Sequence, residues 1–200
     1  MGNVLERSGI AEAFYETIHL WMGRLNGGLA IASVIVCTFM AAMVGVIAAG
    51  IVTMGIIALP AMLNRDYDKH MAAGSIMAGG SLGSLIPPSV IMMLYSLVAR
   101  QSVGRMFMGG IFPGFVLSAL YCIYIAIRCA LRPKMGPALP PEARGTWKEK
   151  FVSLRGSILP VALIVVVLGS IFMGLTTPSE ASAIGAIGAF ICAAIYRKLN

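Results

Sequence analysis

Long uncharged runs separated by short charged turns dominate the pattern of this chain. Residues 25–64 contain no charged residue, and neither do residues 71–99. A single helix over the first run would be about 60 Å long, whereas the hydrocarbon core of a bilayer is about 30 Å thick. The first run must therefore fold back on itself, and the stretch from Val44-Gly45-Val46 to Gly50 is the natural bend. Two full spans and one re-entrant hairpin both satisfy this pattern.

The second uncharged run cannot be one continuous helix. Pro87 and Pro88 lack an N–H group, and their rings would clash with the preceding turn of a helix. The residue before each proline is also pushed towards an extended conformation. We expect a helix that stops near Leu85 and restarts at the prolines, which suit the first helical position. Broken backbone at membrane depth is tolerated inside protein or along a polar cavity. A binding site and a proline kink that serves helix packing both remain open readings.

The remaining elements follow from periodicity and from turn signals. Apolar residues recur every three or four positions from Ile10 to Leu25, which predicts an amphipathic helix at the membrane surface. Thr177-Pro178-Ser179-Glu180 predicts a capping box with proline at the first helical position. The predicted segments are a surface helix at 1–26, the hairpin at 27–64, the discontinuous helix at 70–99, a transmembrane helix at 106–128, a basic connector at 129–156, and transmembrane helices at 157–176 and 177–197.

Composition and charge agree with an all-α integral membrane protein. The chain is 58% hydrophobic and 12% charged, with a mean hydropathy of +0.89, whereas soluble domains average about 25% charged residues. The net charge of +7 is read as membrane topology and not as nucleic-acid binding. A cytoplasmic connector at 129–156 places 13 Lys and Arg residues inside and only Arg100 and Arg105 outside, as the positive-inside rule requires.

The predicted spans contain no Asp, Glu, Lys or Arg between the charged turns. Proton pumps and intramembrane hydrolases need titratable groups at depth, so an enzyme is not expected. A broken helix offers other chemistry. Carbonyl groups near Gly83, Ser84 and Leu85 would suit Na⁺, and N–H groups after Pro88 would suit an anionic carboxylate. No cofactor and no further metal are expected.

The residues at the break also resemble a known family. Gly-Gly-Ser-Leu-Gly-Ser-Leu-Ile-Pro-Pro-Ser at 79–89 is similar to the hallmark of the large permease (M) subunit of TRAP transporters, and 176–185 is similar to that family's second hallmark. Shorter matches occur in the same order along the chain: Met1-Gly2-Asn3, Ser8-Gly9-Ile10-Ala11, Gly27-Gly28-Leu29-Ala30, Ala58-Leu59-Pro60-Ala61-Met62 and Ser102-Val103-Gly104.

The resemblance implies a multi-pass permease of the bacterial inner membrane that imports a small organic acid, such as a C4-dicarboxylate, with Na⁺. Its implied partners are a small (Q) membrane subunit and a periplasmic substrate-binding protein, with no role for nucleic acid. It also implies one half of an elevator-type carrier built from two inverted repeats, with 28–62 as the hairpin and 71–98 as the discontinuous helix. The implied substrate and ion contacts are Val44, Gly45 and Val46 at the hairpin tip and Gly79, Gly80, Ser81, Gly83, Ser84, Pro87, Pro88 and Ser89 at the break.

Two departures from the family pattern shape these expectations. Many members carry Ser-Gly-Ser-Ser at the hairpin tip, whereas this chain has Met43-Val44-Gly45-Val46-Ile47, so ion contacts there would rest on backbone carbonyls. The chain also has about half the expected length, which predicts an N-terminal-half fragment that does not transport alone. The alternative to a carrier subunit is a non-transporting membrane scaffold whose glycines and prolines serve helix packing.

Overall fold

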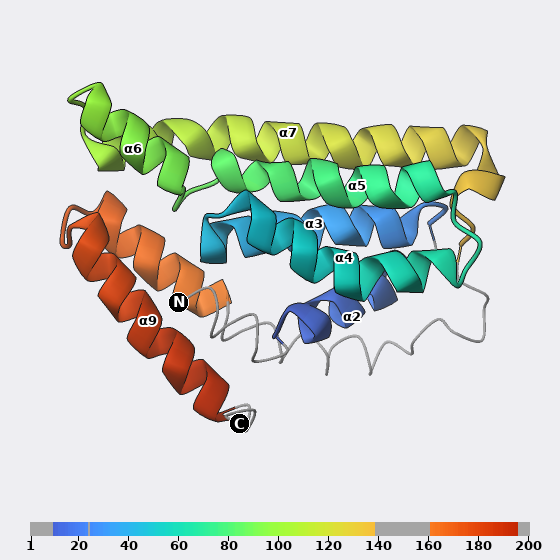
Figure 1. Ribbon diagram of the computed structural model, residues 1–200, viewed down its shortest axis with the longest axis horizontal. Coiled ribbons are helices and arrows are strands. Elements are labelled where there is room, and N and C mark those ends of the chain that lie inside the picture. The colour runs from blue at the N-terminus through green and yellow to red at the C-terminus, as the bar shows by residue number, and fades with distance from the viewer. Residues whose placement is uncertain (1–9, 24, 139–160, 196–200) are drawn as a thin grey trace.

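The computed structural model describes residues 10–23, 25–138 and 161–195, and these residues form helices, turns and short extended segments without a strand (Figure 1). The all-α class predicted from the sequence is therefore confirmed for this part of the chain. The elements are α2 (Ile10–Met22), α3 (Gly28–Val44), α4 (Ile47–Leu63), α5 (Lys69–Ser81), the 3₁₀ turn η1 (Leu82–Ser84), α6 (Val90–Val98), α7 (Val103–Leu131), the 3₁₀ turn η2 (Pro133–Met135), a helix at Val161–Phe172, and α9 (Pro178–Ile195).

Helices α3 and α4 form an antiparallel hairpin whose tip is Gly45-Val46 (Figure 1). Gly45 ends α3 in the left-handed conformation, at φ 69°, and its N–H donates to the Ala41 carbonyl. Val46 is extended and precedes the first residue of α4. Glycine adopts positive φ without the steric penalty that a side chain brings. Each arm has 17 residues and is therefore about 25 Å long, slightly less than the thickness of the bilayer core.

Helix α3 lies at the centre of the structure, in contact with α2, α4, α5 and α7. Its residues from Leu29 to Val36 are almost entirely buried, with Ile35 only partly so. Small residues let the neighbouring helices approach: a Cβ placed on Gly79 of α5 would lie 2.9 Å from the Cβ of Cys37. A buried hydrogen bond of 2.8 Å between the hydroxyls of Thr38 and Ser118 joins α3 to α7.

Helix α7 is longer than the span predicted at 106–128. It runs for 29 residues, so Arg105 and Arg128 lie in its first and last turns and Cys129–Leu131 belong to the helix and not to the connector. Arginine stems can lie along apolar surface while the guanidinium group reaches water, which explains why the charges do not end the helix. Among the described residues, α7 is the helix long and apolar enough to cross a membrane, and most of its apolar window faces outwards.

The start of the connector packs against the base of the hairpin. The Gly27 N–H donates to the Gly136 carbonyl at 2.9 Å, and the Asp68 N–H donates to the Met135 carbonyl at 3.1 Å. Residues 139–156 of the predicted connector, and residues 157–160 and 196–197 of the predicted spans, lie outside the described residues. Within the described part, Val161–Phe172 is the helical core of the span predicted at 157–176.

The motif at the start of α9 forms the predicted capping box. The Glu180 carboxylate accepts hydrogen bonds from the backbone N–H of Thr177, at 2.7 Å, and from its hydroxyl, at 2.9 Å. The Glu180 N–H lies 3.4 Å from the Thr177 hydroxyl oxygen. Pro178 is the first residue of α9, where its missing N–H costs no helical hydrogen bond. The motif therefore stabilises the first turn of this helix.

The amphipathic helix α2 is attached to the hairpin through aromatic and polar contacts. Phe14 packs on Phe39 with ring centroids 4.9 Å apart. His19 stacks on Tyr15, and its Nε2 accepts a hydrogen bond of 2.9 Å from the guanidinium of Arg65. Arginine has no acceptor atom, so this contact requires the neutral imidazole. Burial of His19 and the nearby Arg65 charge lower the pKa of His19 from 6.5 to about 4.

The lowered pKa of His19 predicts that acid destabilises the packing of α2. The unfolded chain takes up a proton at His19 as the pH falls below 6.5, whereas the folded chain resists protonation down to about pH 4. Stability present above pH 6.5 is therefore lost between pH 6.5 and 4. Allowing for the partial exposure of His19, the loss is about 1 kcal/mol by pH 5, or roughly 2–4 °C in Tm.

The measurement is the thermal unfolding midpoint of wild type and His19→Gln at pH 7.5 and 5.0. The glutamine carbonyl can still accept from Arg65 but does not titrate, so the variant should lose less stability on acidification. An equal decrease in both proteins would show that His19 does not carry this pH dependence.

Candidate functional site: the hairpin tip and the helix break

The break between α5 and α6 is wider than the sequence predicts. Helix α5 ends at Ser81, η1 continues to Ser84, and α6 begins only at Val90. The peptide bond between Pro87 and Pro88 is cis. The expectation that the helix restarts at the prolines is therefore wrong. Ser89 takes the N-cap position instead, in extended conformation, with its hydroxyl oxygen 3.5 Å from the Met92 N–H. Serine is a favoured N-cap. Pro87 precedes Pro88 and is therefore pushed towards an extended conformation, which keeps it from starting the helix.

The two prolines remove hydrogen-bond donors from specific carbonyl groups. In a continuous helix the Gly83 and Ser84 carbonyls would accept from residues 87 and 88, which here have no N–H. The Ser89 hydroxyl replaces one donor, because it donates to the Ser84 carbonyl at 2.8 Å. The Leu82 carbonyl accepts from both the Leu85 and the Ile86 N–H groups. The Gly83 carbonyl loses the donor that residue 87 would provide in a helix, so its lone pairs can take another ligand.

The other serines of the break satisfy their own hydroxyl protons locally. Ser81 donates to the Ala78 carbonyl at 2.7 Å, and Ser84 donates to the Ser81 carbonyl at 2.9 Å. A hydroxyl that donates its proton still has oxygen lone pairs to offer. The Leu85 carbonyl points towards α7, since a Cβ placed on Gly110 would lie 2.7 Å from its oxygen. Of the predicted carbonyls, that of Ser84 is engaged by the Ser89 hydroxyl and that of Leu85 faces α7.

The hairpin tip lies directly against the break. The Gly45 carbonyl accepts a long hydrogen bond of 3.4 Å from the Val90 N–H. A Cβ on Gly45 would collide with the Pro88 carbonyl oxygen, and a Cβ on Gly83 would lie 3.4 Å from the Ile47 nitrogen. The absence of side chains at these glycines lets two backbones meet. The structure therefore brings together the two segments that the sequence resemblance assigns to one site.

Glycines also set the approach of the two elements below the tip. A Cβ on Gly80 would collide with the Ile51 side chain, and a Cβ on Gly50 would lie 3.9 Å from the Cα of Gly80. Gly79 and Gly80 are therefore packing residues between α5 and the hairpin. Ile51 and the Thr38–Ser118 pair were not identified from the sequence. The sequence shows Thr38 and Ser118 as single hydroxyl residues within apolar runs, but it does not indicate that the two meet.

The break is enclosed by the protein on one side and partly exposed on the other. Gly83, Ile86 and Pro87 are buried, and Ser89 is only 1% exposed. Ser81, Ser84 and Pro88 are half-buried, and Val46 at the tip is 45% exposed. Among the described residues, no group of three or more His, Cys, Asp or Glu side chains gathers where it could hold a metal ion.

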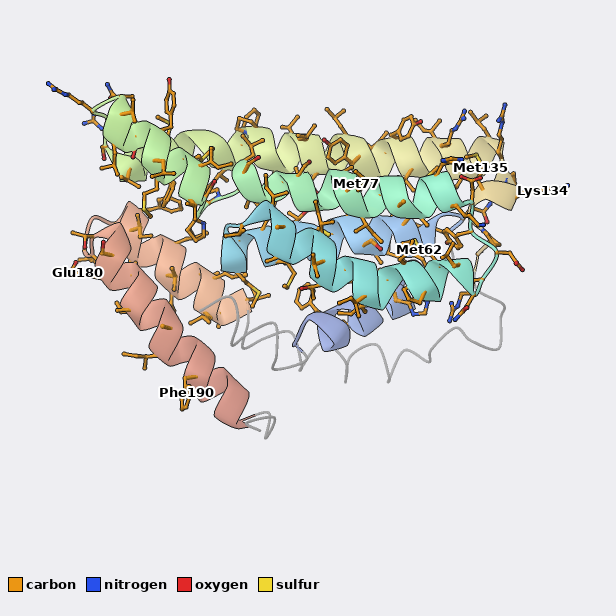
Figure 2. All side chains as sticks on the ribbon, in the orientation of Figure 1. Met62, Met77, Lys134, Met135, Glu180 and Phe190 are labelled. Carbon is orange, nitrogen blue, oxygen red and sulfur yellow. The ribbon has the colours of Figure 1, made fainter. Side chains whose placement is uncertain are left out.

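The Thr177–Glu180 motif belongs to a different part of the structure. Glu180 lies at the first turn of α9, a helix apart from α2, α5 and α7, which contact the hairpin (Figure 2). The hydrogen bonds described for this motif remain within it and cap the helix. The structure therefore gives it a role in starting α9.

Comparison with known proteins gives one consistent result. Residues 1–200 match the family model described as "Tripartite ATP-independent periplasmic transporter, DctM component". The chain is 37% identical over 197 residues to the C4-dicarboxylate TRAP transporter large permease protein DctM of Vibrio cholerae, covering 98% of this chain and 42% of the relative. It is 29% identical over 181 residues to the ectoine TRAP transporter large permease protein TeaC of Halomonas elongata, covering 90% and 41%.

A third relative has a longer chain. The isethionate TRAP transporter permease protein DctMQ of Oleidesulfovibrio alaskensis is 30% identical over 204 residues, which cover all of this chain and 31% of the relative. The chain therefore spans less than half the length of the curated relatives that it matches here.

The contact between the tip and the break predicts a strong effect of Gly45→Ala. The new Cβ would collide with the Pro88 carbonyl, and alanine at positive φ costs a further 1–2 kcal/mol or so. We expect a loss of about 2 kcal/mol or more in the free energy of unfolding. The control is Gly55→Ala in α4, whose Cβ would meet no atom within 4 Å and which should be neutral or stabilising by up to about 1 kcal/mol. Equal stability of the two variants would contradict the described contact.

Proposed function

Because this chain belongs to the DctM family of tripartite ATP-independent periplasmic (TRAP) transporter permeases, we propose that it supplies one half of the substrate and ion path of a Na⁺-coupled uptake system. The observation that supports this proposal is the meeting of the hairpin tip and the helix break. Two interrupted helices converge there on backbone polar groups, in a part of the chain without ionised side chains. Interrupted helices near the bilayer midplane are where secondary transporters bind ions and substrates.

Na⁺ is proposed to bind at the C-terminal end of the first half-helix. The Gly83 carbonyl loses its helical donor to Pro87, and the carbonyls of Ser84 and Leu85 follow it in the chain. Carbonyl oxygens at the end of a helix carry the negative pole of its dipole, which favours a cation. At the hairpin tip, where Val44 and Val46 replace hydroxyl-bearing residues, the ion can use only backbone carbonyls.

A carboxylate of the substrate is proposed to bind at the N-terminal end of α6. The positive pole of the helix favours an anion there. The Val90 N–H is engaged by the Gly45 carbonyl at 3.4 Å and the Met92 N–H by the Ser89 hydroxyl at 3.5 Å. Both bonds are long, so a carboxylate, which is a stronger acceptor, would replace either one. We propose a small organic acid as substrate, with C4-dicarboxylates tested first because the V. cholerae relative is named for them.

The permease is proposed to work in the bacterial inner membrane with a small membrane subunit and a periplasmic binding protein. A tripartite family by definition combines three components. The orientation follows from charge. One end of the structure carries Arg65 and Lys69 at the turn between α4 and α5, and Arg128, Arg132 and Lys134 at the end of α7, whereas the other end carries Arg100 and Arg105 (Figure 1). The more basic end is placed in the cytoplasm. The complete carrier would pair this half with an inverted repeat of similar build and move as an elevator.

Ser89→Ala tests the ion site. The substitution removes the donor to the Ser84 carbonyl and the N-cap of α6, so we expect weaker Na⁺ binding and at least a threefold rise in the Na⁺ concentration that gives half-maximal uptake. Uptake of a C4-dicarboxylate is measured in proteoliposomes that contain the complete permease, its small subunit and its binding protein.

The matched control is Ser96→Ala, which removes another buried hydroxyl of α6, bonded to the Met93 carbonyl at 2.7 Å. This variant should retain the Na⁺ dependence of the wild type. A wild-type Na⁺ dependence in Ser89→Ala would count against the ion site.

A non-transporting scaffold is distinguished by Gly83→Ala, whose Cβ only reaches van der Waals contact with the tip. Loss of uptake in a fully assembled complex favours the carrier.

A further inference from the structure

A second feature of the molecule is a groove between α5 and α7 with a volume of about 770 Å³. It does not include the break or the hairpin tip. Helix α5 contributes Gly74 and Ala78, and α7 contributes Leu117, Tyr121 and Tyr124. At one end the groove is lined by His70, Arg128 and Met135. The groove is therefore apolar along most of its length and cationic at one end.

The groove exists because small residues on one helix face large residues on the other. Gly74 and Ala78 are one helical turn apart, and a Cβ added to Gly74 would meet no atom within 4 Å. The groove follows α7 from Leu117 to Arg128, twelve residues, and the rise between these two residues is about 16 Å along the helix axis. Half of a bilayer core about 30 Å thick has the same depth. The groove thus extends from the charged end of α7 to about the middle of the membrane.

The charged side chains at the cationic end of the groove, near Arg128, all favour an anion. Arg128 is half-buried in the groove, and Arg132 and Lys134 follow it at the same end of the structure (Figure 2). No Asp or Glu lines the groove. The nearest acid along α5 is Asp68, whose carboxylate accepts hydrogen bonds from the His70 and Met71 N–H groups and so caps its own helix. Basic pockets of this kind on the cytoplasmic side of membrane proteins attract phospholipid headgroups.

We propose that this groove binds an anionic phospholipid of the cytoplasmic leaflet. One acyl chain lies along Gly74, Ala78 and the aromatic face of α7, and the phosphate contacts Arg128. The length of the groove matches one leaflet, and its polarity matches the polarity of the lipid. A transmembrane helix would also fit against Gly74 and Ala78, but it would leave the half-buried Arg128 without an anion. The lipid would hold α5 and α7 together on the side that faces away from the hairpin.

The test measures lipid retained by the purified full chain after exchange into a mixture of phosphatidylglycerol and phosphatidylcholine, by native mass spectrometry. We expect at least a threefold preference for phosphatidylglycerol.

Gly74→Leu fills the groove and should lower total bound lipid at least threefold, whereas Gly55→Leu, also placed in open space, should not. Arg128→Gln should abolish the preference, whereas Arg105→Gln, at the opposite end of α7 and outside the groove, should preserve it. Equal lipid binding by the two leucine variants, or an unchanged preference in Arg128→Gln, would overturn the proposal.

A second measurement does not depend on how well these variants fold. A photoreactive amino acid at position 124, where Tyr124 is 62% exposed in the groove, is activated in native membranes. Cross-linking to phospholipid supports the proposal. Cross-linking to polypeptide, from a second copy or from a partner subunit, would overturn it.

Discussion

The structure depends on two missing N–H groups. Pro87 and Pro88 leave the Gly83 and Ser84 carbonyls without the donors that a continuous helix would provide. In a membrane such groups must find partners within the protein. The Ser89 hydroxyl becomes the donor for one of them, and the burial of Gly83 keeps the other away from lipid. Ser89 is also the N-cap of α6. One residue therefore supplies a missing donor to the first half-helix and starts the second.

The close packing around the break depends on backbone atoms more than on side chains. Gly45 contacts Pro88, Gly83 contacts the start of α4, and Gly80 contacts Ile51. Each contact would be blocked or tightened by a single methyl group. This explains how a tip with Val44 and Val46 in place of hydroxyl-bearing residues can still adopt the hairpin geometry. It also makes backbone carbonyls the principal polar atoms that the tip can present.

The sequence was sufficient to predict the features that follow from covalent geometry. The bend at Gly45, the interruption at the double proline and the cap at Thr177–Glu180 each come from residues with few conformational choices. Element ends were less predictable: Ser89, and not the prolines, begins α6, and α7 continues past Arg105 and Arg128. Those boundaries depend on competition between a serine cap and a proline, and on whether an arginine can reach water. Tertiary contacts such as Thr38–Ser118 and His19–Arg65 join residues far apart in the chain, and local patterns do not encode them.

The Thr38–Ser118 hydrogen bond has a mechanical consequence. Helix α3 carries the tip, α5 leads into the break, and α3 is tied to α5 at Cys37–Gly79 and to α7 at Thr38–Ser118. Both ties lie at neighbouring residues of α3, and sliding of the three helices past one another would break the buried Thr38–Ser118 hydrogen bond or press Cys37 against Gly79. A displacement of α7 is therefore passed to α3, which ends at the hairpin tip. The hairpin tip would therefore move together with α7 and would not hinge on it.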